Sequence, residues 1–320
     1  MIDDPAAGIA RSPATAAAGP ASGEAAGDAR RGALMVFVAA MAWSFGGAIA
    51  RALETTDSWT IVAWRGFFAA AFLVVFMLKR DGVKGTGVLF LTMGRPGMVV
   101  ALCFACASVS FVVALSHTTV ANILLMQAGV PLIAALMGVV FLRERVDLVT
   151  WGAIVTVGLG IVVMVWDSFS AAISPLGDGL ALLIAVCFSL ATVVTRRYSG
   201  VRMTPAVTLG ALIGTAIGMS LSSGLIVSLQ DFFYLFLFGA FNLGLGLALF
   251  VTGARLIPSA LAALISLCEP IFGPVWVWLF HDETPAARTL VGGGIVFAAL
   301  FAHILWQWRI NRRAALPIPN

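Results

Sequence analysis

The side chain best suited to chemistry in this sequence is a carboxylate, Glu269, which lies inside an apolar run at residues 258–280. If this run is a helix rising about 1.5 Å per residue, Glu269 lies about 16 Å from its start, near the middle of a hydrocarbon layer of roughly 30 Å. A charge at that depth costs roughly 2.5–3.5 kcal/mol. Glu269 is therefore a candidate for reversible proton binding or for binding a substrate amino group. The structural alternative is that it bonds backbone groups freed by Pro270.

Other polar and aromatic side chains lie equally deep in other apolar runs. A tryptophan normally prefers the membrane interface, so Trp43, beside Ser44 in the middle of its run, suggests an aromatic wall that stacks on a ring or a cation. A buried amide such as Asn242 must find a partner. The candidate substrate-binding residues are Trp43, Ser44, Ser110, Asn122, Gln127, Asn242, Ser266 and Glu269. Ordinary core packing is the alternative for each of them.

The same inventory speaks against catalysis and metal binding. The three histidines, His117, His281 and His303, lie in separate parts of the chain, so we assign no catalytic residue. The C-x-x-C formed by Cys103 and Cys106 has no second Cys pair or nearby His to complete a metal site. We therefore expect no metal, no cofactor and no enzyme activity. The phosphate-binding motif G-x-x-x-x-G-K-[ST] does not occur, so we expect no ATP-hydrolysing domain in this chain.

Helices within a membrane must position these side chains. Of the 320 residues, 61% are hydrophobic and 11% are charged, whereas soluble domains carry about 25% charged residues. The apolar runs are about 20 residues long, which is the length that crosses a bilayer as a helix. We predict an all-α integral membrane protein with ten transmembrane helices, at residues 33–53, 60–78, 96–115, 120–140, 148–166, 177–195, 205–223, 232–250, 258–280 and 288–308. The links are short, and the longest, 79–95, leaves no room for a soluble domain.

The basic residues predict the orientation. Sixteen of the 19 Lys and Arg residues lie in one set of alternate loops and in the two terminal segments, and only Arg51 and Arg288 lie in the other set. By the positive-inside rule both termini are cytoplasmic and the number of spans is even. Residues 1–32, rich in Ala, Gly and Pro, predict a disordered cytoplasmic tail rather than a cleavable signal peptide. Residues 309–320 form a second cytoplasmic tail, and we expect the protein in the bacterial inner (plasma) membrane.

The sequence also repeats itself at long range. An offset of 139 residues aligns two segments that each carry a proline and, further on, a glutamate, and an offset of 145 aligns positions nearer the start of each half. The matched pairs are Pro131 with Pro270, Glu144 with Glu283, Ser44 with Ser189 and Gly32 with Gly177. A Pro and a Glu held at the same spacing indicate an internal duplication.

The duplication divides the chain into two halves, residues 33–166 and 177–308, each with five predicted spans. Because five is odd, the halves must enter the membrane in opposite senses. Inverted repeats of this kind allow access to alternate between the two sides of a midplane site. Pro131 and Pro270 are the predicted helix breaks that take part in gating, and kinks made only for packing are the alternative.

Three further features have simpler interpretations. Arg65 lies close to the external edge of its span, so we expect it to snorkel or to pair locally with Glu54 or Asp57. Five tryptophans near span ends are expected in the interfacial belt: Trp59, Trp276, Trp278, Trp306 and Trp308. The doubled G-x-x-x-G of Gly210, Gly214 and Gly218 permits close helix contact, either inside the monomer or at a dimer seam.

The stretches 121–160 and 259–294 resemble the EamA-type family of the drug/metabolite transporter (DMT) superfamily. The resemblance rests on Pro131, Glu144 and Trp151-Gly152-Ala153 in the first half, and on Glu269-Pro270, Glu283 and Gly292-Gly293-Gly294 in the second. Ala42-Trp43-Ser44 fits as well. It implies two EamA-like repeats in a ten-helix bundle that carries small organic solutes, and members similar to the YddG-type exporters move amino acids. Phe188 stands where the first half has Trp43, so a paired aromatic site would be asymmetric.

From these features we predict a secondary-active transporter that exports amino acids or related small metabolites by alternating access. Its partners are a small-molecule substrate and the lipid bilayer, with protons as the candidate coupling ion and no nucleic acid. The chain acts as a monomer or a weak homodimer. The alternatives are a passive facilitator or uniporter, and an importer of another metabolite or of a drug-like cation, with the same fold.

Overall fold

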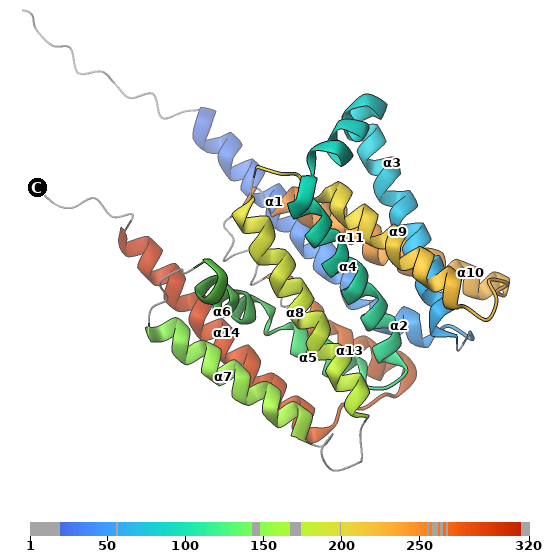
Figure 1. The fold of residues 1–320 in the computed structure, drawn as a ribbon. Coiled ribbons are helices and arrows are strands. Elements are labelled where there is room, and N and C mark those ends of the chain that lie inside the picture. The colour runs from blue at the N-terminus through green and yellow to red at the C-terminus, as the bar shows by residue number, and fades with distance from the viewer. Residues whose placement is uncertain are drawn as a thin grey trace, which may run out of the picture.

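The computed structural model describes residues 20–314 except 56, 143–147, 167–173, 199, 255, 258–261, 263–264 and 267. The described part is all helical, without strands (Figure 1). The helices are α1 (Pro20–Ser44), α2 (Gly46–Arg51), α3 (Ser58–Thr92), α4 (Gly94–Leu115), α5 (Val120–Gln127), α6 (Val130–Leu142), α7 (Leu148–Val165), α8 (Pro175–Arg197), α9 (Thr204–Leu221), α10 (Leu229–Phe236), the π-helix η2 (Leu237–Leu245), α11 (Gly246–Gly253), α13 (Cys268–His281) and α14 (Ala287–Ala314).

The helices are apolar enough for a multi-pass membrane protein. Among the described residues, seven helices are long and apolar enough to cross a bilayer, and the bent pair α5 and α6 would make an eighth. The helix α7 is apolar but shorter over its described part, Leu148–Val163, and the predicted range 258–280 is described only in part. Membrane spanning is therefore clear, whereas the count of ten stays a prediction.

Two predicted non-helical segments are wrong in part. The helix α1 begins at Pro20, so the end of the predicted disordered tail is helical; residues 1–19 lie outside the described residues. The predicted link 79–95 continues α3 up to Thr92, with one break at Gly82, whose φ of 71° suits glycine. Residues 83–92 contain two glycines, two threonines and two valines, so intrinsic helix propensity does not account for this part of α3.

The chain bends near Pro131, while the predicted gating role of this residue stays a prediction. The helices α5 and α6 are separated at Ala128 and Gly129 and bend by 42°. Proline at the second residue of α6 cannot donate a backbone hydrogen bond to the preceding turn, so the ladder opens there. A second break, at Phe45 between α1 and α2, was not predicted. The break predicted at Pro270 stays a prediction, because several residues before it lie outside the described part.

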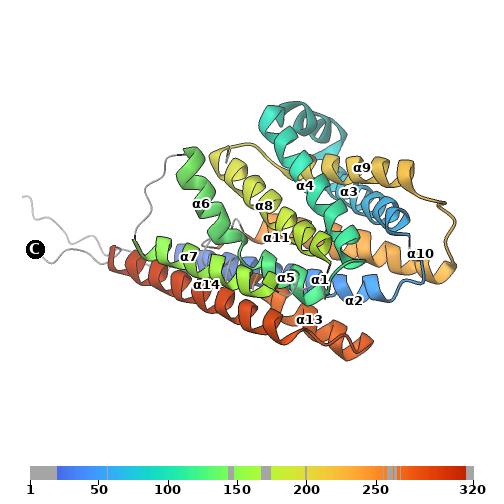
Figure 2. The ribbon, with the colours of Figure 1, turned by 60° about the horizontal axis from the view of Figure 1, so that its bottom comes forward.

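The helices pair according to a regular pattern (Figures 1 and 2). The helix α1 packs on α11 and α13, while α8 packs on α4 and α6; likewise α3 packs on η2 while α9 packs on α4. The helices α3 and α9 also pack on each other, as do α7 and α14. If the halves are exchanged, each of these pairings maps onto another pairing or onto itself.

Individual residues follow the same exchange. A side chain at Gly32 would meet Leu256 and Ile257, and one at Gly177 would meet His117 and Thr118. Leu256 and Ile257 follow His117 and Thr118, respectively, by 139 positions in the chain. Trp43 packs on Phe250 and Phe188 packs on Phe104, with ring centroids 5.3 and 5.4 Å apart. The two halves thus make matching contacts at corresponding places.

Candidate functional site

The most unusual polar group in the core is Arg65 on α3. The residue is 6% exposed, and its Nη1 donates to Ser108 Oγ on α4 at 2.8 Å. Its guanidinium carbon lies 5.3 Å from the Phe111 ring centroid and 4.3 Å from that of Phe238. The expected snorkelling or local ion pair with Glu54 or Asp57 is therefore wrong. The reason is that the helix face of Arg65 turns inward, against α4 and η2, instead of toward the external loop.

Glu269 lies on the interior face of α13. Before its last turn, α13 exposes Ile271, Val275 and Trp278, whose spacing of four and three marks one face turned outward; Leu279 and Phe280 at its end are exposed as well. Glu269 and Trp276 lie seven residues apart on the opposite face. Glu269 is neither buried nor fully exposed, and it lies near enough to Arg65 for the two charges to interact. Among the described residues no protein donor bonds its carboxylate.

The break between α1 and α2 forms another side of this region. The Asn242 amide on η2 donates to the carbonyls of Ala42 and Trp43, at 2.8 and 3.1 Å. These carbonyls lie at the end of α1, where the helical ladder is interrupted. The π-helical turn that carries Asn242 brings its side-chain amide against Gly46. A Cβ added to Gly46 would lie only 2.9 Å from the Asn242 amide nitrogen, so a larger residue would crowd it. Asn242 thus satisfies two backbone carbonyls at the break, and π-helical turns of this kind are frequent at functional sites.

Trp276 links α13 to the same break. Its indole Nε1 donates to Ser44 Oγ at 3.0 Å, and its ring stacks on Phe45 with centroids 4.8 Å apart. Ser44 is fully buried and donates in turn to the Met41 carbonyl at 2.7 Å. The expected interfacial position of Trp276 is therefore wrong, because its indole N–H found a buried acceptor across the helix interface.

The structure thus brings together three predicted site residues, Trp43, Ser44 and Asn242, at the break between α1 and α2. Glu269 lies on α13, the helix whose Trp276 contacts the same break. The structure does not connect the other four to them. Gln127 and Ser266 bond carbonyls of their own helices, Ile123 and Ala262. Ser110 is buried in α4, and Asn122 belongs to a network at one end of the bundle. The binding roles of all eight stay predictions.

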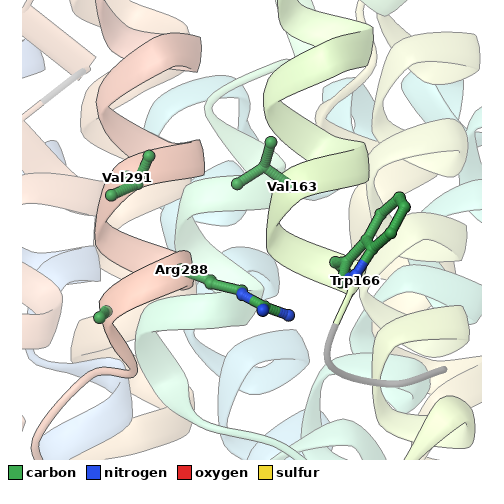
Figure 3. A pocket seen from close by; sticks show the side chains of 5 residues that line it. Val163, Trp166, Arg288 and Val291 are labelled. Carbon is green, nitrogen blue, oxygen red and sulfur yellow. The ribbon is translucent and has the colours of Figure 1, made fainter. Parts of the chain in front are cut away.

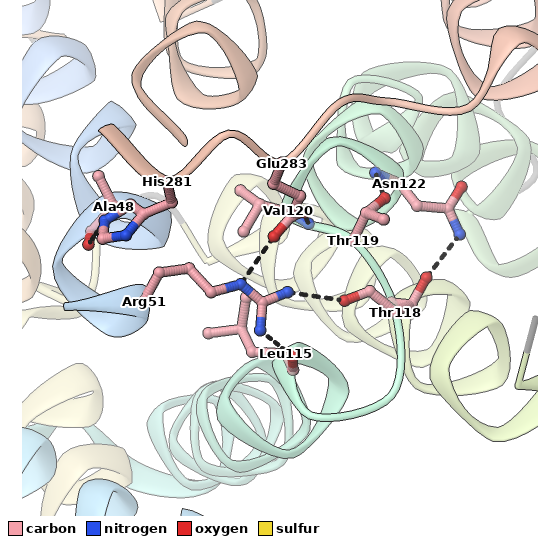
Figure 4. Close-up of polar contacts among 9 residues, drawn as sticks. All are labelled: Ala48, Arg51, Leu115, Thr118, Thr119, Val120, Asn122, His281 and Glu283. Atoms are coloured by element: carbon pink, nitrogen blue, oxygen red, sulfur yellow. Dashed lines mark hydrogen bonds and ion pairs between the residues drawn. The ribbon is translucent and has the colours of Figure 1, made fainter. Parts of the chain in front are cut away.

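That network joins three loops (Figure 4). Arg51, at the end of α2, forms an ion pair with Glu283 at 2.8 Å and donates to the carbonyls of Leu115 and Thr118 at 2.8 and 3.3 Å. The second Glu283 oxygen accepts the Val120 N–H at 2.9 Å, where α5 begins. Close by, His281 Nε2 is 2.9 Å from the Ala48 carbonyl.

The network continues into α8. Asn122 donates to Thr118 Oγ1 at 3.2 Å and to Asp178, which is buried near the start of α8. Glu283 thus bridges the α13–α14 loop to α2 and α5. We call the set Arg51, Glu283, Leu115, Thr118 and Val120 the end latch.

Two hollows open on the surface, away from the central residues. One of about 350 Å³ lies beside the end latch and is lined by Arg51, Leu115, Ser116, His117, Thr118, Thr119 and Ser174. Another of about 350 Å³ lies between α7 and α14, where Arg288 and Trp166 face the same space as Val163 and Val291 (Figure 3). Both are shallow, and neither reaches Glu269.

The comparison with known families settles the class of protein. The model of the EamA-like transporter family matches the chain twice, over residues 30–166 and 175–305. The chain belongs to the EamA-like transporter family. These two ranges lie within a few residues of the predicted halves. Membership in this family of membrane transporters speaks for a transporter and against an enzyme.

Two similar proteins agree with this family assignment. The pseudopaline exporter CntI of Pseudomonas aeruginosa is 27% identical over 280 residues, which cover 85% of this chain and 95% of that protein. A solved crystal structure with 17% sequence identity matches with a TM-score of 0.60, over 84% of this chain and 95% of its own. At that identity the likeness concerns the fold alone.

The residue that sequence analysis missed is Arg65. Its burial was underestimated, because Glu54 and Asp57 lie just across the turn and were expected to pair with it. The available signal was the absence of any acidic residue one helical turn away within the span, at positions 61, 62, 68 or 69. A cation without an acidic partner on its own helix is costly within a span and marks a candidate functional residue.

Proposed function

We propose that this member of the EamA-like family is a secondary-active transporter of the bacterial inner membrane that exports amino acids or related small organic metabolites by alternating access. The observation that carries the proposal is the central group of polar and aromatic residues, which lies at a helix break inside a family fold of transporters. The similar protein with a known cargo is an exporter, and this supports the direction of transport.

The proposed mechanism requires two inverted repeats. Support comes from the double family match and from the pairings of α1 with α13 and of α8 with α6, which exchange when the halves are exchanged. Five spans in each half would give these repeats opposite orientation. Rocking of one half against the other would then expose the central site to each side in turn. Both termini would be cytoplasmic, and one chain would suffice as the working unit.

Glu269 is the proposed proton-binding residue. Its position on the interior face of α13, away from the lipid-facing positions, supports an exchange of a proton for a substrate amino group at one carboxylate. Such competition couples the two fluxes, because the carboxylate cannot hold both at once. Proton entry would then drive export of the solute. Arg65 is the charged residue with which this carboxylate interacts electrostatically.

The test uses purified protein in liposomes with a mixture of radiolabelled L-amino acids outside. An acidic interior should speed saturable uptake several-fold in the wild type and should have little effect in Glu269→Gln. Counterflow of labelled against unlabelled amino acid distinguishes a carrier from a pore, since a pore shows none. Absence of saturable uptake for every amino acid would overturn the proposed cargo. An unchanged pH response in Glu269→Gln would remove Glu269 from coupling.

A further inference from the structure

We infer that Arg65 is the anchor for a carboxylate group of the transported solute, and that Arg65 and Glu269 together select zwitterions. The ligand class is a small solute that carries a carboxylate and a protonated amine on one short scaffold. This inference rests on the proposed function, because it assigns the polar contacts of the proposed transport site. It adds a residue that the sequence alone did not place in that site.

The first observation is the incomplete bonding of the guanidinium. Arg65 is 6% exposed, and its Nη1 donates to Ser108. Its Nε–H is buried and has no acceptor among the described residues. Arginine carries five N–H donors, and a buried donor left without an acceptor is costly. A carboxylate suits these donors best, because its two oxygens accept in the same plane as two N–H groups of the guanidinium.

The second observation is the way the guanidinium is held. The Phe238 ring on η2 and the Phe111 ring on α4 both lie within 5.3 Å of its central carbon. These contacts come from two different helices and restrict the rotation of the side chain. Neither ring offers an oxygen acceptor. The protein therefore fixes the orientation of Arg65 but leaves its anion to come from elsewhere.

The third observation is the separation of the two charges. Arg65 contacts Phe238 on η2, about one turn from Asn242, and Glu269 lies about two turns from Trp276 on α13; both Asn242 and Trp276 bond the break between α1 and α2. Among the described residues no direct ion pair or hydrogen bond joins Arg65 to Glu269, although Arg51 and Glu283 do form one. A direct pair would satisfy both charges and leave no role for a ligand. Two opposite charges held apart are complementary to a solute whose own opposite charges are held apart.

Charge compensation explains why a zwitterion should be preferred over either half of it. A simple amine could pair with Glu269 but would leave Arg65 without an anion, and a simple acid would leave Glu269 without a cation. In the low dielectric of the membrane interior an uncompensated charge is expensive. Selectivity therefore arises as much from the penalty on the wrong solute as from attraction to the right one.

The experiment compares three probes on one scaffold in the purified full-length protein. L-Phenylalanine carries both charges, 2-phenylethylamine lacks the carboxylate, and 3-phenylpropionate lacks the amine. Binding is measured by thermal shift and by competition against labelled amino-acid uptake in liposomes. The variants are Arg65→Gln, Arg65→Lys and Glu269→Gln, with Arg288→Gln as the control arginine at the surface. Helicity and monodispersity in detergent show which variants are folded.

In the wild type and in Arg288→Gln, L-phenylalanine should bind at least tenfold more tightly than either analogue. Arg65→Gln should weaken L-phenylalanine and 3-phenylpropionate by at least tenfold and 2-phenylethylamine by less than about threefold, and Arg65→Lys should restore part of the loss. Glu269→Gln should weaken binding of L-phenylalanine and 2-phenylethylamine by at least tenfold and binding of 3-phenylpropionate by less than about threefold.

Equal losses for all three probes in a folded Arg65→Gln would show a structural arginine and would overturn the inference. Equal binding of the amine and the zwitterion by the wild type would overturn it as well, and so would binding of none of the three. Failure of the proposed function looks different, because it would abolish saturable uptake of every labelled amino acid in the wild type. Transport that persists without the zwitterion preference would reject this inference alone.

Discussion

Single polar residues in this protein act mainly where the backbone is interrupted. In a membrane every freed N–H and C=O group must find a partner within the protein. The Asn242 amide does this for the two carbonyls at the end of α1. Ser189 on α8 behaves differently, because its hydroxyl lies 2.7 Å from the Ala185 carbonyl of its own helix and 3.1 Å from the Val130 carbonyl of α6. The break between α1 and α2 can therefore persist without the energetic cost of unbonded carbonyls at Ala42 and Trp43.

Asp57 provides a residue-scale prediction at the start of α3. Its carboxylate accepts the Trp59 N–H at 3.1 Å, the Thr60 hydroxyl at 2.7 Å and the Ser223 N–H at 3.0 Å. Asp57→Ala should lower the free energy of unfolding by about 1 kcal/mol, the usual value of an N-cap. Thermal unfolding in detergent measures the loss. Asp57→Asn should retain most of the stability, because its amide oxygen still caps the helix.

The pH dependence of this cap follows from its pKa. Burial by itself would raise the pKa of Asp57, but the hydrogen bonds from Thr60, Ser223 and Trp59 outweigh it, and the pKa lies below the ordinary value of 3.8. A lowered folded-state pKa contributes stability that is present above pH 3.8 and is lost as the pH falls through the folded value. The difference between wild type and Asp57→Ala should therefore shrink below that range. A difference that grows in acid would contradict this assignment.

At the scale of elements, small residues on α9 set the distance to its neighbours. A Cβ at Gly218 would lie 2.5 Å from the Ala63 backbone nitrogen on α3, and one at Gly210 would lie 2.6 Å from the Ala101 carbonyl on α4. A Cβ at Gly214 would be 3.8 Å from its nearest neighbour, Val109. Two of the three glycines thus serve contacts inside the monomer.

This difference predicts opposite effects for two similar substitutions. Gly218→Ala should cost about 1–3 kcal/mol, because the new methyl group forces α9 away from α3. Gly214→Ala should be neutral or stabilising by up to about 1 kcal/mol, because alanine favours the helix. Thermal unfolding in detergent compares the two variants. Equal destabilisation by both substitutions would contradict the open space described at Gly214.

The contacts of the end latch join helices at one end of the bundle, so they must break if access alternates there. It ties α2 to the α4–α5 and α13–α14 loops through Arg51 and Glu283. Arg51→Gln should raise labelling of a cysteine at Ala48, a buried position of α2, by several-fold with an impermeant thiol reagent. The measurement needs a background in which the four native cysteines are replaced.

Arg202→Gln is the matched control for the latch. It removes an ion pair of 2.7 Å with Asp81, a contact that lies outside the latch and joins α3 to the α8–α9 turn. Labelling at Ala48 should stay at the wild-type rate in this variant. A rate that rises equally in both variants would indicate general loosening of the bundle, and an unchanged rate in Arg51→Gln would show that the latch does not control access.

At the scale of the whole molecule, the proposed mechanism depends on opposite insertion of the two halves. Arg145 and Thr284 are equivalent positions of the two sequence halves, at an offset of 139 residues. Single cysteines at these positions should react with impermeant reagents from opposite faces of the membrane, with Arg145→Cys accessible from the cytoplasmic side. Right-side-out and inside-out vesicles provide the two arms. Labelling of both cysteines from one face would end the inverted-repeat proposal.

Much of the architecture could be predicted from the chain alone. The apolar runs, the break before Pro131 and the two halves matched by the family model are all encoded within short segments or in their direct repetition. Hydrophobic length and proline geometry act locally, so the sequence determined them. Glu269 was identifiable as exceptional for the same reason, because a carboxylate in an apolar run is costly whatever surrounds it.

The partners of the polar residues were decided only by the tertiary structure. Arg65 with Phe238, Trp276 with Ser44, and Arg51 with Glu283 are each separated by more than 170 positions in the chain. Such pairs form because particular faces of different helices meet when the bundle packs. The rotation of each helix about its axis fixes those faces, and it depends on the close contacts of small residues along all neighbouring helices at once. No local pattern in the sequence contains that information.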